Sequence, residues 1–559
     1  SQFLNTVGGV RRIEQLAVQR AQVAVNGQPR VFAATPPDAG FASAFDSKFD
    51  VTHLADRTLP GTREVSDPTG LASGAMLYTW KLEPGQSREV ALVLPQTGNW
   101  SMPGRFDADK AQQQVAAMWR QKLDQVRLQL PEAGQPLADT LRTALAHMLI
   151  SRVGPSLQPG TRSYARSWIR DGAMISEGLL RLGREDAVRQ YLEWYAPYQF
   201  DSGMVPCCVD ARGSDPVPEN DSHGELIHAI ASYWRHTGDL EFLQRMWPHV
   251  LAAWGYMEDL RLSERSEDNR ARNPGFYGMM PASISHEGYS AKPVHSYWDD
   301  FWALRGYKDA ADMAVALGLA TEAEAMAASR DQFRQDLDAS LRASMAAHRI
   351  DYLPGSVELG DFDATSTTIA LAPGGEQGRL PQPALDITFE RYWQQFVERR
   401  DGKRQWKDYT PYEWRNVGAF VRLGWRERAW EASEFFFRDR APPAWNQWAE
   451  VVSSTPRTPF FVGDLPHAWV ASDFVRSALD MFAYEREIDD AVVLAAGVPA
   501  AWLAGKGIAI EGLRTAHGPL RYSLVRDERE LTLKVADGLR LPSGGLVLPW
   551  PYAGQPGQA

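Results

Sequence analysis

Residues 285–302 read Ser-His-Glu-Gly-Tyr-Ser-Ala-Lys-Pro-Val-His-Ser-Tyr-Trp-Asp-Asp-Phe-Trp, and they decide how the rest of the chain is interpreted. Two adjacent carboxylates, Asp299 and Asp300, lie between aromatic residues that include Trp298, and a helical pattern follows from Ala303. Aromatic faces can stack on sugar rings, and apolar surroundings disfavour the ionised form of a carboxyl group. The stretch therefore suits sugar chemistry, although an Asp N-cap followed by a Trp-rich core explains the same residues.

Two earlier loops have the same mixture of aromatic and charged residues. Trp168-Ile-Arg-Asp171 precedes a helical pattern, and Arg170 beside Asp171 can form a fixed hydrogen-bonding pair for sugar hydroxyls. Pro218-Glu-Asn-Asp-Ser-His-Gly-Glu225 places Glu219 and Asp221 at the entrance of the next helix. Helix capping explains Asp171 taken alone, and capping and substrate contact explain Glu219 and Asp221 equally well.

A late loop, Trp445-Asn-Gln-Trp-Ala-Glu-Val-Val452, contains an acid in an apolar setting. Glu450 lies between Trp448 and two valines, so a solvated surface charge is a poor explanation for it. A buried glutamate paired with an arginine is the alternative. His467 follows shortly afterwards, just before the last helical pattern.

Between residues 134 and 488 the hydrophobic spacing predicts one helix after another. Short turns alternate with longer loops, and the longer loops carry the aromatic and acidic residues. This alternation predicts an (α/α)6 toroid of helical hairpins with one functional, loop-rich rim. The twelve expected helices cover residues 136–152, 171–183, 185–198, 221–238, 240–262, 298–318, 321–346, 363–372, 385–400, 411–424, 427–439 and 466–486.

The flanking regions have β patterning. Residues 1–105 alternate apolar and polar positions between turn signals and predict a β-sandwich, whose abrupt start suggests that sequence upstream of Ser1 is missing. Residues 106–133 predict a linker helix, with apolar positions at helical spacing from Asp107 to Leu130. Residues 489–559 predict a small C-terminal β-sandwich. The predicted fold is therefore mainly α, with a toroid at 134–488.

Composition excludes several classes of function. The 559 residues carry 59 Lys and Arg against 70 Asp and Glu, a net charge of −11, so nucleic-acid binding is not expected. No segment predicts a membrane span, and no Cys/His spacing predicts a metal site or a cofactor. The two cysteines, Cys207 and Cys208, are adjacent and read either as buried thiols or as a vicinal disulfide that stiffens a sugar platform. We expect a periplasmic or secreted bacterial protein, with a cytoplasmic one as the alternative.

With these stretches the chain resembles the (α/α)6-barrel glycoside hydrolases, which are also called the glucoamylase-like six-hairpin glycosidases. Trp168-Ile-Arg-Asp171 is similar to the family's Trp-x-Arg-Asp loop, and Tyr297-Trp-Asp-Asp300 is similar to its Leu-Trp-Glu-Glu motif, with Asp in place of Glu. Glu450 matches the placement of the family's late general base. The flanking β-domains resemble those of α-L-rhamnosidases.

The resemblance implies hydrolysis of a glycosidic bond in an oligosaccharide or polysaccharide, with exo action and inversion. It implies that Asp299 is the acid and Glu450 the base, with their carboxyl groups about 6.5–9.5 Å apart. Glu287 is the reserve acid. The implied sugar-binding residues are Trp168, Arg170, Asp171, Glu219, Asp221, Glu287, Trp298, Asp300, Trp448 and His467.

Three other readings stay open. A phosphorylase on the same toroid needs a phosphate cradle, and no Gly-rich or basic loop lies near Glu450. An epimerase or lyase uses His or Tyr as proton shuttles, and the expected rim carries His223, His286, His295 and His467. A non-catalytic carbohydrate-binding toroid would keep the aromatic residues without needing both carboxylates.

Overall fold

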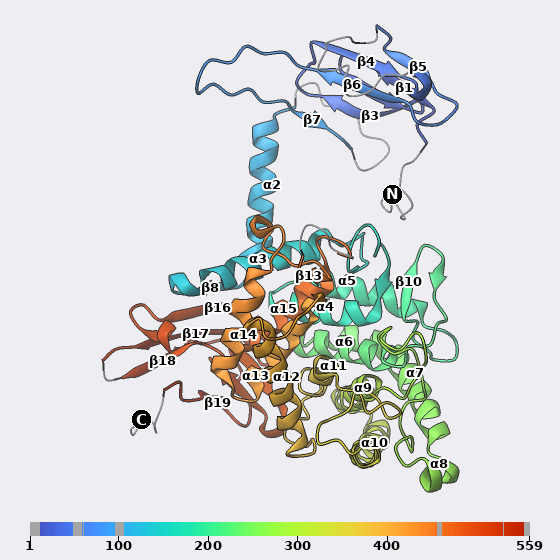
Figure 1. Cartoon of the computed structure of the whole chain (residues 1–559), viewed down its shortest axis with the longest axis vertical. Helices are drawn as coiled ribbons and strands as arrows, with labels where there is room; N and C mark the ends of the chain where they lie inside the picture. Colours follow the sequence, from blue (N-terminus) through green and yellow to red (C-terminus); the bar gives the residue numbers. More distant parts are fainter. Residues whose placement is uncertain are drawn as a thin grey trace. The chain divides into compact units, whose positions relative to one another are not determined.

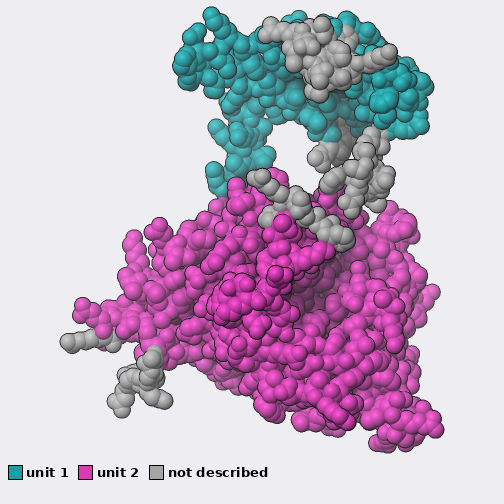
Figure 2. All heavy atoms as spheres, viewed as in Figure 1, with its two compact units in different colours: residues 1–121 teal, residues 122–559 magenta. Residues whose placement is uncertain are grey.

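The computed structural model describes residues 12–47, 59, 61–95, 106–455, 461–528 and 530–552. The chain forms two compact units, residues 1–121 and 122–559 (Figure 2). Among the described residues the α-helices lie in the second unit, apart from most of α2 (Ala108–Leu123), and strands occur in both units (Figure 1). No helix among the described residues is long and apolar enough to cross a membrane.

The first unit contains two antiparallel sheets. One has the order β5-β1-β2-β3-β7 and the other pairs β4 with β6. Leu16 and Val18 of β1 bury their side chains with Ala42 of β4 and Ala72, which makes a small apolar core of its own. The strands are β1 (Gln15–Val18), β2 (Gln22–Val25), β3 (Gln28–Ala33), β4 (Ala39–Ser43), β5 (Glu64–Ser66), β6 (Ser73–Leu77) and β7 (Leu92–Val93).

Helices dominate the second unit, and their order follows the sequence prediction. Each of the twelve expected helices has a counterpart at or near its predicted place, although the one expected at 363–372 shrinks to a single turn, α11. An unpredicted short helix, α8, occupies Glu267–Arg272. The counterparts are α3 (Gln135–Ile150), α4 (Ile169–Arg181), α5 (Glu185–Tyr195), α6 (Ser222–Thr237), α7 (Leu240–Glu264), α9 (Tyr297–Ala316), α10 (Ala320–His348), α11 (Ala364–Thr367), α12 (Ala384–Arg400), α13 (Trp414–Arg422), α14 (Arg426–Arg438) and α15 (Ala468–Asp480).

Two glycines allow a close approach between α6 and α9. A Cβ atom on Gly306 of α9 would lie 2.8 Å from the Cα atom of Gly224 in α6. A Cβ atom on Gly224 would lie 2.1 Å from the Trp302 carbonyl oxygen. Because only glycine lets two backbones approach this closely, this pair fixes the spacing of the two helices that begin with Asp221 and Trp298 nearby.

The C-terminal strands pack on the helices. They form one sheet of order β18-β17-β16-β8 and another of order β14-β15-β19, and their apolar residues belong to the same continuous core as the helices. These strands are β8 (Arg127–Gln129), β14 (Ala483–Arg486), β15 (Ala491–Leu494), β16 (Ile508–Thr515), β17 (Gly518–Arg526), β18 (Leu531–Val535) and β19 (Leu546–Val547). Shorter pairs near the loops are β9 (Ser167–Trp168), β10 (Cys208–Asp210), β11 (Gly213–Ser214), β12 (Asp408–Tyr409) and β13 (Val452–Ser453).

Two expected helices end earlier than predicted because strand pairing takes over their ends. The helix expected up to Leu130 stops at Leu123, since residues 127–129 pair with Ala509–Glu511 of β16. The helix expected up to 486 stops at Asp480, since residues 483–486 pair with Ala491–Leu494 of β15. A strand distant in sequence outweighs local helical spacing in the first case, and a neighbouring hairpin strand does so in the second.

Candidate active site

The N-terminal ends of five helices meet at one place in the second unit. The Trp298 indole Nε1 of α9 donates to Asp221 Oδ2, the N-cap of α6, at 2.8 Å. The Arg170 guanidinium of α4 lies 5.0 Å from the Trp469 ring of α15. The Arg415 guanidinium of α13 lies 5.1 Å from the Trp298 ring. Helix N-termini carry a positive partial charge, so this place favours carboxylates and polar ligand oxygens.

Arg170 is the central cation of this cluster. It is buried, its Nη1 donates to Glu219 Oε2 at 2.5 Å, and the same nitrogen lies 3.6 Å from Asp221 Oδ2. Its Nη2 lies 3.8 Å from Glu287 Oε1. Burial raises the pKa of Glu219 to about 7, although the Arg170 charge opposes that rise. One guanidinium therefore ties together three of the acids expected at the site.

Asp171, the next residue of α4, faces the interior. It is 1% exposed, and its Oδ1 has no hydrogen-bond partner among the described residues. Burial raises the pKa of Asp171 well above its ordinary value. Burial therefore favours the protonated form of Asp171, and its unpartnered oxygen is available to a water molecule or a ligand hydroxyl.

Glu450 lies in a second cluster made by aromatic and imidazole groups. The Tyr164 hydroxyl donates to Glu450 Oε2 at 2.6 Å, and the Tyr412 hydroxyl donates to Oε1 at 3.2 Å. His467 caps α15 by accepting the Val470 amide at Nδ1, so the ring proton sits on Nε2, 3.9 Å from Glu450 Oε2. Burial raises the pKa of Glu450, and the two tyrosine hydrogen bonds oppose that rise.

A glycine with positive φ makes room for this carboxylate. Gly463 has φ +63°, and a Cβ atom there would lie 2.4 Å from Glu450 Oε2. The neighbouring Asp464 accepts the backbone amides of Arg162, Ser163 and Tyr164 at 2.9–3.0 Å. The loop that carries Tyr164 is therefore held by the loop that follows Glu450.

Glu287 completes the site from the 285–296 loop. Its side chain is 54% exposed, and its Oε1 accepts the Trp168 indole Nε1 at 3.1 Å. The Trp168 and Tyr164 rings meet edge to face with centroids 6.0 Å apart. Two glutamates thus flank one pair of aromatic rings, Glu287 on Trp168 and Glu450 on Tyr164. Such a pair, one exposed and one largely buried, can supply a proton donor and a proton acceptor on two sides of a bound group.

Asp299 and Asp300 lie beneath the site and are fully buried. Both oxygens of Asp299 are occupied, Oδ2 by the Ser283 hydroxyl and Oδ1 by the Ser285 hydroxyl, each at 2.7 Å. Asp300 Oδ1 accepts the Met280 amide at 2.9 Å. Burial raises the pKa of both, that of Asp300 to about 7. The two aspartates hold the loop that carries Glu287, a position that does not suit direct proton transfer to a ligand.

Trp448 is an expected site residue that lies among core aromatic residues. It is 2% exposed, its Nε1 donates to the Phe436 carbonyl at 2.7 Å, and its ring packs on Trp414 and Phe474. Trp448 therefore anchors the loop of Glu450 in the core. The other predicted residues, Trp168, Arg170, Glu219, Asp221, Glu287, Trp298, Glu450 and His467, are brought together in the two clusters.

Comparison with known proteins bears on the fold of the chain and on its family resemblance. Residues 137–262 match the family described as amylo-alpha-1,6-glucosidase. No curated protein sequence matches the chain. A bacterial glucoamylase complexed with acarbose is similar over 84% of this chain and 75% of its own, at a TM-score of 0.55 and 11% identity. The resemblance to the (α/α)6 glycosidase superfamily is confirmed.

Two rhamnosidases share the glycosidase fold. The GH78 family rhamnosidase of Bacillus sp. GL1 covers 76% of this chain at a TM-score of 0.54 and 12% identity. The α-L-rhamnosidase from Dictyoglumus thermophilum covers 77% at a TM-score of 0.52 and 10% identity. This chain spans only 42% and 46% of those two proteins. At such identities the likeness concerns the fold alone.

Sequence reasoning missed four residues of this site: Tyr164, Tyr412, Arg415 and Trp469. Arg415 and Trp469 lie in the first turns of α13 and α15, Tyr412 lies just before α13, and Tyr164 lies five residues before α4. Nearness to the start of a helix is the signal that they share with the predicted residues. The carboxylate that both tyrosines contact, Glu450, is 286 residues from Tyr164 and 38 from Tyr412, so no local pattern connects them.

Cys207 and Cys208 are free and buried, as the first of the two readings expected. Their sulfur atoms lie 3.0 Å apart. Cys208 begins β10 and pairs with Trp168 of β9, so the two cysteines form part of the framework behind Trp168. Among the described residues no group of three or more His, Cys, Asp or Glu side chains could hold a metal ion.

Proposed function

We propose that this protein is a glycoside hydrolase that cleaves an oligosaccharide or polysaccharide by inversion, with Glu287 as the acid and Glu450 as the base. The observation that carries the proposal is the pair of glutamates on either side of Trp168 and Tyr164. We assign the acid role to Glu287 and not to Asp299, because the Glu287 side chain is exposed to a ligand, whereas both carboxylate oxygens of Asp299 accept serine hydroxyls.

The environment of Glu450 supports its role as a base. Two tyrosine hydroxyls and the Nε2 side of His467 surround its carboxylate and favour the ionised form. A carboxylate held in this way can orient a water molecule and accept its proton as the water attacks the anomeric carbon. Glu287, next to Arg170 and the Trp168 indole, would give its proton to the leaving oxygen on the other side of the sugar.

We also propose that the helices form a toroid of six hairpins and that the enzyme acts on chain ends. Trp469 lies between Arg170 and Arg415, with guanidinium-to-ring distances of 5.0 and 5.7 Å, and all three residues are buried. This layer would close the floor of the site, so that a polysaccharide chain could not pass through it. A sugar at the floor would meet Asp171, Arg170 and Asp221.

The roles of the two glutamates can be separated by the leaving group of the substrate. Glu287→Gln and Glu450→Gln should each lower kcat on oligosaccharides by about 10²–10⁴-fold. On aryl glycosides whose phenol needs no protonation, Glu287→Gln should recover much of its rate and Glu450→Gln should not. NMR of the first product should show the inverted anomer.

Three outcomes would contradict the proposal. Wild-type rates in both glutamine variants would remove the pair from the chemistry. A rate in Asp299→Asn that recovers only on aryl glycosides whose phenol needs no protonation, with a normal Glu287→Gln profile, would return the acid role to Asp299. Turnover that requires phosphate would identify a phosphorylase, in which phosphate replaces the water activated by Glu450.

A further inference from the structure

A separate cavity of about 650 Å³ lies at the other ends of the helices that build the candidate active site. On α4, Arg170 belongs to the candidate active site, while Glu177 and Arg181 line the cavity two to three turns later, about 10–16 Å along the axis. On α6, Asp221 belongs to the active site, while Arg235 and His236 line the cavity. Its volume is in the range of small-molecule binding pockets.

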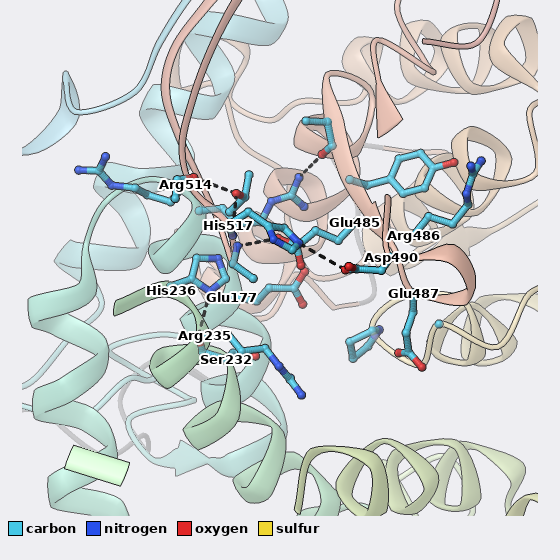
Figure 3. Close-up of a pocket in the computed structure, with 18 of the residues that line it drawn as sticks. Glu177, Ser232, Arg235, His236, Glu485, Arg486, Glu487, Asp490, Arg514 and His517 are labelled. Atoms are coloured by element: carbon cyan, nitrogen blue, oxygen red, sulfur yellow. Dashed lines mark hydrogen bonds and ion pairs between the residues drawn. The ribbon is translucent and has the colours of Figure 1, made fainter. Parts of the chain in front are cut away.

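The C-terminal strands close the cavity on its other side. Glu485 and Arg486 come from β14, Arg514 from β16, and His517 from the turn between β16 and β17 (Figure 3). His517 Nε2 lies 3.8 Å from Asp490 Oδ1 in the same view. Glu485 Oε1 accepts the Ala516 amide at 2.7 Å, which holds that turn against β14.

The charges of the cavity wall are almost all paired. Asp480 is held by Arg181 and Arg422, each at 2.7 Å. Glu487 bridges Arg305 at 3.0 Å and Lys308 at 2.6 Å. Asp309 pairs with Arg235 and Arg305. Further ion pairs of the wall are Glu177–Arg476, Arg235–Asp312, Arg486–Asp489 and Arg514–Glu185.

Arg540 and Glu485 have no group of opposite charge within 4.0 Å among the described residues, and Asp490 has only the His517 ring, at 3.8 Å. The wall as a whole carries seven arginines against six carboxylates. An anion or a cation would therefore gain little net attraction and would compete with existing pairs. Paired carboxylates still offer free lone pairs, and paired guanidinium groups still offer N–H donors. A wall of mixed donors and acceptors with nearly balanced charge matches a ligand rich in neutral hydroxyl groups.

We propose that this cavity is a second saccharide-binding site, separate from the candidate active site and specific for a neutral sugar. Its ligand would exchange hydrogen bonds with water for hydrogen bonds with Arg540, Glu485 and the paired groups around them. The choice of saccharides as the test ligand rests on the proposed function. The match between the cavity wall and a neutral ligand does not rest on the proposed function, because it depends only on the balanced charges of the wall.

Hydrogen exchange measured by mass spectrometry can report on the two sites separately. The Glu450→Gln variant is used, so that the sugar is not consumed, with maltotriose and rhamnose as probes. We expect slower exchange in residues 232–238 and 513–518, which line the cavity, and independently in residues 285–289 of the active-site loop. Titration of each segment gives its own apparent Kd.

Substitutions at the two unpaired groups test the cavity without leaving a buried charge alone. Arg540→Ala and Glu485→Gln, each added to Glu450→Gln, should weaken the protection of residues 232–238 about tenfold, the equivalent of about 1.4 kcal/mol. Glu485→Gln keeps the hydrogen bond from the Ala516 amide. Arg342→Ala, which removes an exposed arginine from α10, is the matched control and should change neither segment.

Absence of protection at residues 232–238 with both sugars would overturn the cavity proposal, whatever the hydrolysis assay gives. Protection there that persists unchanged in Arg540→Ala and Glu485→Gln would also overturn it. Loss of protection only at residues 285–289 would instead count against the proposed active site. The two proposals therefore fail by different results.

Discussion

Glu450 shows how a single carboxylate is tuned at this site. Burial raises its pKa, while hydrogen bonds from Tyr164 and Tyr412 lower it. Burial also raises the pKa of the Tyr164 and Tyr412 hydroxyls, so both stay protonated and remain donors. The balance decides the pH at which Glu450 becomes a carboxylate and can act as a base.

The Tyr164→Phe substitution should shift the acidic limb of the kcat/KM profile upward by about one pH unit. The lost hydrogen bond stabilised the ionised form, so without it the pKa of Glu450 rises further and activity is lost at a higher pH as the pH falls. The pH–rate profile on a soluble substrate gives the measurement.

Tyr409→Phe is the matched control, since its hydroxyl donates to Asp439 at 2.8 Å, a tyrosine–carboxylate bond that is not among the contacts of Glu450. It should leave the profile in place. An acidic limb that stays fixed in Tyr164→Phe, or that moves to lower pH, would show that Glu450 does not set it.

At the scale of elements, the site depends on how closely α6 and α9 approach. These helices carry Asp221 and Trp298 at their N-terminal ends, and the hydrogen bond between the two residues joins the ends at 2.8 Å. Gly224 and Gly306 allow the approach by presenting backbone to backbone. The local pattern predicted each helix, but the glycine contact that spaces them depends on both helices together.

Gly306→Ala should lower the free energy of unfolding by roughly 1–3 kcal/mol, because its Cβ atom would press on the Gly224 backbone, which cannot move aside alone. Gly255→Ala in α7 is the matched control, since nothing lies within 4 Å of its Cβ position. It should be neutral or stabilising by up to about 1 kcal/mol. Denaturant unfolding measures both, and equal effects would contradict the packing argument.

At the scale of the whole molecule, the chain has two compact units with separate apolar cores. The core of the first is small, built on Leu16, Val18, Ala42 and Ala72. The core of the second runs without a break through the helices and the C-terminal strands. The predicted division at 488/489 therefore separates segments that share one core, and the boundaries proposed from sequence stay predictions.

Separate cores predict at least two unfolding transitions in calorimetry. Val18→Ala, at a buried position in the small core, should lower only the transition of the first unit. Val475→Ala, at a buried position of α15, should lower only the larger one. A single transition that moves with both substitutions would show that the two units unfold together.

The sequence by itself determined the order of the helices and the position of the polar, aromatic loops before them. Helical spacing and turn residues are local signals. They predicted twelve helices, each of which has a counterpart in the structure, and they placed Trp168, Arg170, Asp221 and Glu450 among the candidate site residues. The tertiary structure decided which carboxyl groups meet and how exposed they are. Trp168 and Glu287 are 119 residues apart, and Tyr164 and Glu450 are 286 apart. Asp299 is buried and Glu287 is exposed although they are only twelve residues apart, because desolvation and hydrogen bonding depend on what the fold places around a group.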